Sequence, residues 1–232
     1  MQSENVEAWS TVLMGEVLLF GLLGKALFGE PDKAWLESLI EEDVFSEAPF
    51  GADQPEIKSG LECLNRWALE NRNGLDEAGI KVLRQDQLLL FIGIDRVLAP
   101  MWESVYFNIS HLVFQEQTLQ VREWYARFGL QSEQLNREPD DQIGLELSFV
   151  GHLASLALQA QEEGDTQKME LLLQAQRDFL SQHLLRWGPA WTKLVNEHTQ
   201  TDFYRGMAHL THGALLAAAA CLEIPMPKEV SL

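Results

Sequence analysis

Two histidines and two aspartates are the first candidates for chemistry, by type and by spacing. His209 and His212 lie three residues apart, so one face of a helix could present both as metal ligands. No Cys, Asp or Glu near them in the sequence completes a ligand set, and positions at the core edge or surface are the alternative. Asp140 and Asp141 could form a carboxylate pair for acid–base catalysis, but such a pair at a helix start is typical of a cap. We therefore expect no bound metal.

Known catalytic motifs are missing or incomplete. Gly24-Lys25 resembles the end of a phosphate-binding loop, but Leu19 and Ala26 stand where that loop needs Gly and Ser or Thr. The sequence contains neither G-x-S-x-G nor H-E-x-x-H. We predict that the chain is not an enzyme and uses no cofactor.

Charge restricts the class of partner. The chain has 17 Lys and Arg against 35 Asp and Glu, a formal net charge of −18. A nucleic-acid binder needs a basic face, and anionic lipid attracts basic surfaces, so neither partner is expected. A basic partner such as an arginine-bearing peptide would be attracted. The alternative is that the acidic surface only aids solubility.

The compartment follows from the cysteines and the N-terminal segment. Cys63 and Cys221 are far apart, which suggests no disulfide framework and a reducing environment. Residues 12–23 are apolar, but Glu16 interrupts them, and the uninterrupted stretch 17–24 is too short to span a bilayer. The acidic residues before it do not fit a secretory signal. We expect a cytoplasmic protein with no stable membrane insertion.

These residues must be positioned by helices, because helical periodicity dominates the chain. The sequence predicts an all-α protein with Trp187-Gly188-Pro189 separating the last two helices. Helices are predicted over residues 6–28, 32–41, 55–71, 75–91, a segment around 121–128, a segment around 143–157, 166–183 and 201–222. We expect one domain over residues 1–224, a polar hinge at 131–137 between two halves, and a flexible tail at 225–232.

Four segments resemble the TorD/DmsD family of redox-enzyme maturation chaperones. Each is weak alone, but their order and spacing are specific, and they cover the chain from about residue 87 to residue 204. They are Leu90-Phe91-Ile92-Gly93; Ala99-Pro100-Met101-Trp102-Glu103-Ser104-Val105-Tyr106; Glu138-Pro139-Asp140-Asp141-Gln142-Ile143-Gly144; and Phe179-Leu180-Ser181-Gln182-His183-Leu184-Leu185-Arg186-Trp187, followed by Phe203-Tyr204.

The resemblance implies a single-domain helical bundle, either a monomer or a homodimer formed by exchanging halves (a domain-swapped dimer). It implies that the chain binds the twin-arginine signal peptide of a molybdopterin oxidoreductase precursor, assists cofactor insertion and delays export. It implies no chemistry on a substrate.

A twin-arginine signal has two guanidinium groups followed by an apolar stretch, so its receptor needs carboxylates and apolar surface. The candidate carboxylates are Glu103, Glu138 and Asp141. The candidate apolar walls are Leu90, Phe91, Trp102 and Tyr106. Pro139 would fix the chain direction after the hinge, and Gln142 stands where the family has a His that could titrate.

Structural roles are the alternative for several of these residues. Asp140 and Asp141 could simply cap the helix that opens near Ile143. Trp102 and Tyr106 could belong to the core, and we interpret His183 and Trp187 as packing residues. Two other functions stay open: a maturation chaperone for a cytosolic metalloenzyme without an export signal, and, with less support, a nucleotide hydrolase.

Overall fold

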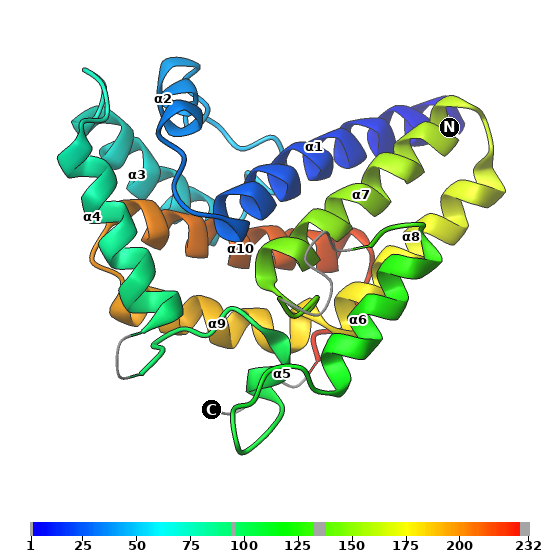
Figure 1. Ribbon diagram of the computed structural model, residues 1–232. Helices are drawn as coiled ribbons and strands as arrows, with labels where there is room; N and C mark the ends of the chain where they lie inside the picture. Colours follow the sequence, from blue (N-terminus) through cyan, green and yellow to red (C-terminus); the bar gives the residue numbers. More distant parts are fainter. Residues whose placement is uncertain (1, 94–95, 132–137, 228–232) are drawn as a thin grey trace.

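The computed structural model describes residues 2–93, 96–131 and 138–227, with side chains from residue 8 onward (Figure 1). The predicted all-α class is confirmed: within these ranges no residue lies in a strand, and one isolated β-bridge joins Trp102 and Gln142. The elements are α1 (Gln2–Phe28), α2 (Lys33–Glu41), α3 (Pro55–Glu70), α4 (Glu77–Gln87), η1 (Leu88–Ile92), α5 (Glu103–Tyr106), α6 (Glu116–Arg127), α7 (Ile143–Glu162), α8 (Thr166–Gln182), α9 (Leu184–His198) and α10 (Asp202–Cys221).

Local signals set several helix ends where the sequence predicts them. Asp32 precedes α2, and its carboxylate accepts a hydrogen bond from the backbone N–H of Trp35, which satisfies one orphan donor of the first turn. Pro55 occupies the first turn of α3, where no N–H is needed. Gly129 follows α6 with φ +71°, a conformation that costs glycine little.

The expectation for residues 187–189 is wrong. Trp187, Gly188 and Pro189 lie inside α9 and do not separate two helices. Trp187 and Trp191 are both fully buried, so tertiary packing outweighs the local cost of proline here. The end of the predicted helix 75–91 also differs, because Leu88–Ile92 form a π-helical turn before Gly93.

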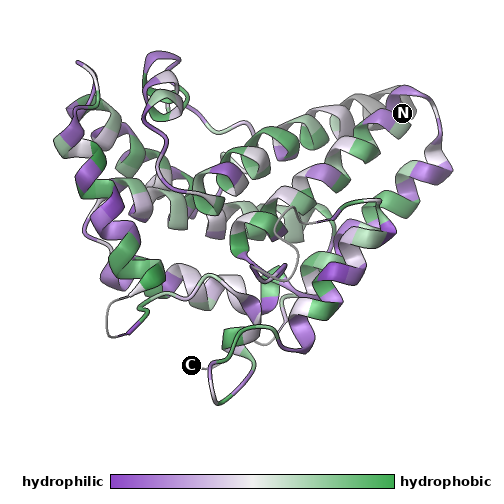
Figure 2. Cartoon of the chain, viewed as in Figure 1, coloured by the Kyte–Doolittle hydropathy of each residue, from purple (hydrophilic) through white to green (hydrophobic). Residues whose placement is uncertain are grey.

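The central helix of the molecule is α10. It packs against α1, α3, α8 and α9, while α7 lies alongside α1 and α8 (Figure 1). Alanine and glycine are frequent in α10, which allows close approach by its neighbours. Figure 2 shows green turns interleaved with purple ones along α6 and α8, as in helices with one face in water.

Helices α1 and α7 are closely packed near the end of α1. A Cβ atom at Gly24 would overlap the side-chain oxygen of Ser148 and lie 2.9 Å from the carbonyl oxygen of Gly144. Segments Ala8–Phe28 and Ile143–Glu162 are long and apolar enough to cross a membrane, but 50% and 61% of their most apolar stretches are buried inside the structure. Their mutual packing accounts for that apolar composition.

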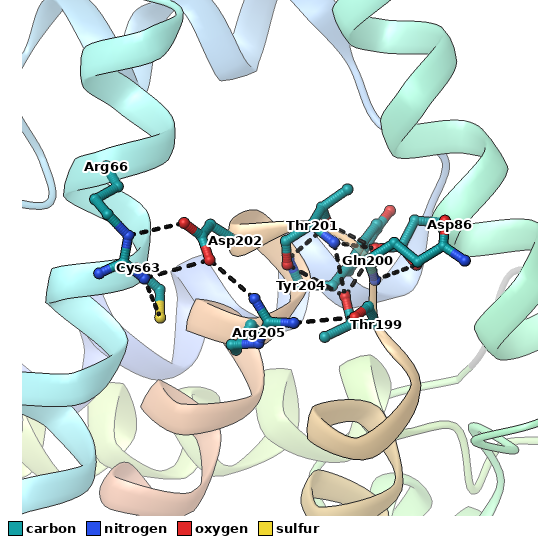
Figure 3. A network of polar contacts seen from close by, with 9 residues as sticks. All are labelled: Cys63, Arg66, Asp86, Thr199, Gln200, Thr201, Asp202, Tyr204 and Arg205. Atoms are coloured by element: carbon teal, nitrogen blue, oxygen red, sulfur yellow. Dashed lines mark hydrogen bonds and ion pairs between the residues drawn. The ribbon is translucent and has the colours of Figure 1, made fainter.

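A buried aspartate ties α4 to the start of α10 (Figure 3). Asp86 is only 3% exposed. Its Oδ2 accepts hydrogen bonds from the hydroxyls of Thr199 (2.7 Å) and Thr201 (2.6 Å) and from the backbone N–H of Thr201 (2.9 Å). The hydroxyl of Thr201 in turn caps α10 by accepting from the N–H of Tyr204. Most of the predicted hinge (residues 132–137) and the end of the predicted tail (228–232) lie outside the described residues.

Candidate functional site

Backbone hydrogen bonds join three of the four signature segments. The N–H of Ala99 in the second segment donates to the carbonyl of Leu90 in the first over 2.8 Å, and two further bonds join the second segment to the third. The N–H of Glu103 donates to the carbonyl of Asp141 over 2.9 Å, and the N–H of Ile143 donates to the carbonyl of Met101 over 2.8 Å. These bonds flank the bridge between Trp102 and Gln142. The structure therefore brings together six of the predicted site residues: Trp102, Glu103, Tyr106, Pro139, Asp141 and Gln142.

Asp141 is fully buried and has internal partners. Its Oδ2 accepts from the backbone N–H of Ser104 over 2.7 Å, and its Oδ1 accepts from the hydroxyl of Thr118 over 2.7 Å. The suggestion that Asp141 caps the helix opening at Ile143 is wrong, because its carboxylate instead caps the short α5. Asp141 thereby ties α5 and α6 to the start of α7.

Gln142 is the residue that caps α7. Its Oε1 accepts from the backbone N–H groups of Gly144 (2.6 Å) and Leu145 (3.1 Å). Its Nε2 donates to the carbonyl of Leu27 over 2.8 Å, at the end of α1. The amide uses both its acceptor and its donor, so this position joins α1 to α7 without a charge.

Glu103 and His183 form a buried pair. Both side chains are shielded from solvent, and Nδ1 of His183 lies 2.8 Å from Oε2 of Glu103. Burial raises the pKa of Glu103, and the contact with His183 opposes that shift. The other oxygen, Oε1, has no partner among the described residues. His183 thus has a polar role in addition to the packing role that the sequence suggested.

Sequence reasoning missed Glu146, a buried polar neighbour of this pair. Glu146 is fully buried, and its Oε2 lies 3.4 Å from Nε1 of Trp187. Burial raises the pKa of Glu146 well above its ordinary value, and the nearby carboxylate of Glu103 raises it further. Asp140 forms an ion pair with Arg122 at 2.7 Å. Glu146 follows the apolar Ile143 by three residues, so both lie on the same inward-facing side of α7. That spacing could have predicted that Glu146 is buried.

The apolar candidates lie mostly in the core. Phe91 stacks on Trp191 with ring centroids 6.1 Å apart, and Leu90 is fully buried. Tyr106 packs against Trp187, and its hydroxyl donates to the carbonyl of Pro100 over 2.8 Å.

Only two of the nine predicted residues keep partial exposure, Trp102 and Glu138. Burial raises the pKa of Glu138, whose carboxyl is half-buried. These two side chains are the ones that a ligand can touch without rearrangement of the protein.

An exposed apolar loop follows α5, and the sequence analysis did not single it out. Ile109 is fully exposed, and Leu112, Val113 and Phe114 are also exposed. So many large apolar side chains in six residues form an unusual surface, which is typical of a binding site. Among the described residues, no group of three or more His, Cys, Asp or Glu side chains could hold a metal ion.

Residues 51–193 match the family described as the nitrate reductase delta subunit. The chain is also similar to the chaperone protein TorD of Vibrio cholerae, with 33% identity over 191 residues that cover 82% of this chain and 79% of the relative. The chain belongs to the TorD/DmsD family of Tat proofreading chaperones. The chain is similar to a protein of Haemophilus influenzae named "probable Tat proofreading chaperone DmsD", with 25% identity over 91% of this chain and 94% of the relative. DmsD of Salmonella typhi is 30% identical over 59% of this chain and 60% of its own.

Family membership confirms the resemblance carried by the four signature segments. The family consists of chaperones and not of enzymes, so the nucleotide hydrolase alternative is wrong. The protein is therefore a maturation chaperone of the TorD/DmsD type. The matched range 51–193 contains all four signature segments, apart from the following Phe203-Tyr204, and the polar residues around Glu103, whereas α1 and α10 lie outside it.

Proposed function

We propose that this chaperone acts in the cytoplasm, where it binds the twin-arginine signal peptide of a molybdopterin oxidoreductase precursor, here called the client. It holds the client until the cofactor is inserted and so delays export. The observation that carries the proposal is membership of the TorD/DmsD family, with the second and third signature segments paired through Trp102 and Gln142. A formal net charge of −18 favours a basic ligand.

The nine predicted residues take two roles in this proposal. Trp102 and Glu138 contact the signal peptide, because they keep exposed surface. Glu138 pairs with a guanidinium, and Trp102 offers an aromatic face to a cation or an apolar side chain. The exposed loop 109–114 extends this surface with apolar side chains. The buried members hold the segments in place: Leu90, Phe91, Glu103, Tyr106, Pro139, Asp141 and Gln142.

Co-purification from native extract, followed by mass spectrometry, tests the client class. We expect a molybdoenzyme precursor that still carries its signal peptide. Recovery of a cytosolic metalloenzyme without such a signal would favour the alternative function, and recovery of no metalloenzyme would contradict both.

Titration calorimetry with the synthetic signal peptide of the co-purified precursor tests the contact residues. Glu138→Gln should weaken binding about tenfold, because one guanidinium loses a charged acceptor. The matched control is Glu170→Gln, which removes the same charge from an exposed position on α8. A peptide with both arginines replaced by lysine should bind more weakly, because lysine cannot form the bidentate pair. If Glu138→Gln binds the native peptide as tightly as wild type and Glu170→Gln do, the assignment of Glu138 is wrong.

A further inference from the structure

A groove lies between α1 and the segment that follows α2, away from the signature segments. Its volume is about 450 Å³, within the range of ligand-binding pockets. Figure 1 shows the light-blue segment after α2 running toward α1. We call this the α1 groove. Its apolar lining comes from three helices and this segment: Leu18, Leu19 and Leu22 of α1, Val44, Phe45, Ala48 and Pro49, Leu61 of α3 and Leu210 of α10.

The edge of the α1 groove is acidic. Glu42, Asp43 and Glu47 line it, and all three side chains are exposed. The described residues that line the groove include no Lys, Arg or His. An apolar floor with uncompensated carboxylates at its edge is complementary to an apolar segment that carries positive charge.

The walls of the groove are held in place by the fold. The carbonyl of Phe45 accepts a hydrogen bond from Nδ2 of Asn65 over 2.8 Å, and the ring of Phe45 packs edge-on against Trp67. The segment also touches α1 directly, because a Cβ atom at Gly15 would overlap the carbonyl oxygen of Pro49. A groove that is already formed loses little conformational entropy when a ligand binds.

We propose that the α1 groove binds the apolar stretch of the client's signal peptide, together with positive charge next to it. This inference rests on the proposed function, since it names a second contact surface for the same ligand. The signature segments supply too few free carboxylates for two guanidinium groups, because Glu103 and Asp141 are fully buried with internal partners. The α1 groove supplies three exposed ones.

The α1 groove and the signature segments contact the same half of α1. Leu18 in the groove and Leu27, whose carbonyl contacts Gln142, are nine residues apart on α1, or roughly 14 Å along the helix axis. An extended peptide covers about 33 Å in ten residues. A peptide of ten residues is therefore longer than the stretch of α1 that separates the groove from the contact with Gln142.

Neutralising the acidic edge tests the charge component. The variant Glu42→Gln/Asp43→Asn/Glu47→Gln removes three charges, and Asn suits the left-handed backbone of residue 43, whose φ is +51°. We expect roughly tenfold weaker binding of the fluorescein-labelled signal peptide of the co-purified precursor at low salt, and a smaller loss at high salt. The control variant Glu70→Gln/Glu162→Gln/Glu170→Gln removes three charges from exposed positions outside the groove and should bind nearly as tightly as wild type.

A matched pair of substitutions on α1 tests the apolar floor. Leu18 and Met14 are 57% and 53% exposed, one turn apart, but only Leu18 lines the groove. Leu18→Gln should weaken binding about fivefold, because less apolar surface is buried in the complex. Met14→Gln makes a comparable exchange on the same helix and should leave the affinity unchanged.

The outcomes separate this inference from the proposed function. If wild-type protein does not bind the signal peptide, the proposed function is wrong. If wild type binds and Glu138→Gln weakens binding, but both groove variants match their controls, the α1 groove is not a contact surface and the inference alone is wrong. Unchanged melting temperatures of the groove variants exclude unfolding as the cause of a loss.

Discussion

Nδ1 of His183 lies 2.8 Å from Oε2 of Glu103, although 80 positions of chain separate the two residues. Both belong to signature segments, and both side chains are excluded from solvent. The pair connects α5 with the turn between α8 and α9, and so it links the surface around Trp102 to the centre of the bundle.

Removing the histidine should destabilise the protein more than neutralising the glutamate. His183→Ala leaves a buried carboxyl without its partner, which should cost about 3 kcal/mol of unfolding free energy. Glu103→Gln keeps an oxygen that accepts from His183 and should cost about 1 kcal/mol. Urea denaturation measures both. His198→Ala, at an exposed position on α9, is the control and should leave the unfolding free energy nearly unchanged. Equal losses of unfolding free energy in His183→Ala and Glu103→Gln would contradict the pairing.

Glu16 should make stability depend on pH. Its side chain is 1% exposed, and burial raises its pKa to about 7, while a hydrogen bond from Gln176 opposes the shift. The folded protein keeps this proton after the unfolded chain releases it, so the stability contributed by Glu16 is present below pH 4.5 and is lost as pH rises through 7.

Glu16→Gln removes this titration. Between pH 4.5 and pH 8, the unfolding free energy of wild type should fall by about 3 kcal/mol relative to that of the variant. Denaturant titrations across this range measure the difference. Glu170→Gln should show no such trend, because Glu170 is exposed. If the difference in unfolding free energy between wild type and Glu16→Gln did not change with pH, Glu16 would have the same pKa in the folded and unfolded protein, which would contradict the prediction.

Two glycines of α1 should respond oppositely to alanine. At Gly21 a Cβ atom meets nothing within 4 Å, so Gly21→Ala should stabilise the helix by about 0.5–1 kcal/mol. At Gly24 the same atom overlaps Ser148, so Gly24→Ala should destabilise by about 2 kcal/mol. Thermal unfolding of the two variants compares them directly, and a stabilised Gly24→Ala would mean that α1 and α7 are less closely packed than the structure shows.

Asp86 should be one of the more sensitive polar positions. Asp86→Ala leaves the hydroxyl of Thr199 and the backbone N–H of Thr201 without this acceptor inside the protein, at a cost of about 3 kcal/mol. Asp86→Asn keeps one acceptor oxygen and should cost less. Hydrogen exchange should show faster opening at the start of α10 in Asp86→Ala. Asp53→Ala, at an exposed position, should have no such effect.

Sequence predicted several helix starts from signals that act within one turn. Asp32 and Pro55 mark helix starts by chemistry that acts within one turn, and the structure confirms both. Pro189 is also a local signal, but it was misleading, because the burial of Trp187 and Trp191 stabilises a helix around it. The periodicity of a segment shows which of its faces is apolar, but it does not show which distant residues will pack against that face.

The candidate site was predicted in its segments but not in its geometry. The family resemblance identified Glu103, Asp141 and Gln142, and the structure places them side by side. Nothing in the sequence distinguishes a carboxylate that faces solvent from one that binds a histidine 80 positions away. The α1 groove was not predicted either, since its lining comes from α1, α3, α10 and the segment after α2.

The packing of α1 on α7 has a consequence for the connectivity of the chain. The main helix contacts of the molecule, α1 with α7 and α3 with α10, each join a helix before residue 131 to one after residue 138. The covalent connection between those residues is therefore not what holds the two parts together. Two separately expressed fragments, ending and beginning in residues 132–137, should assemble into a noncovalent complex with the helical content of the intact chain.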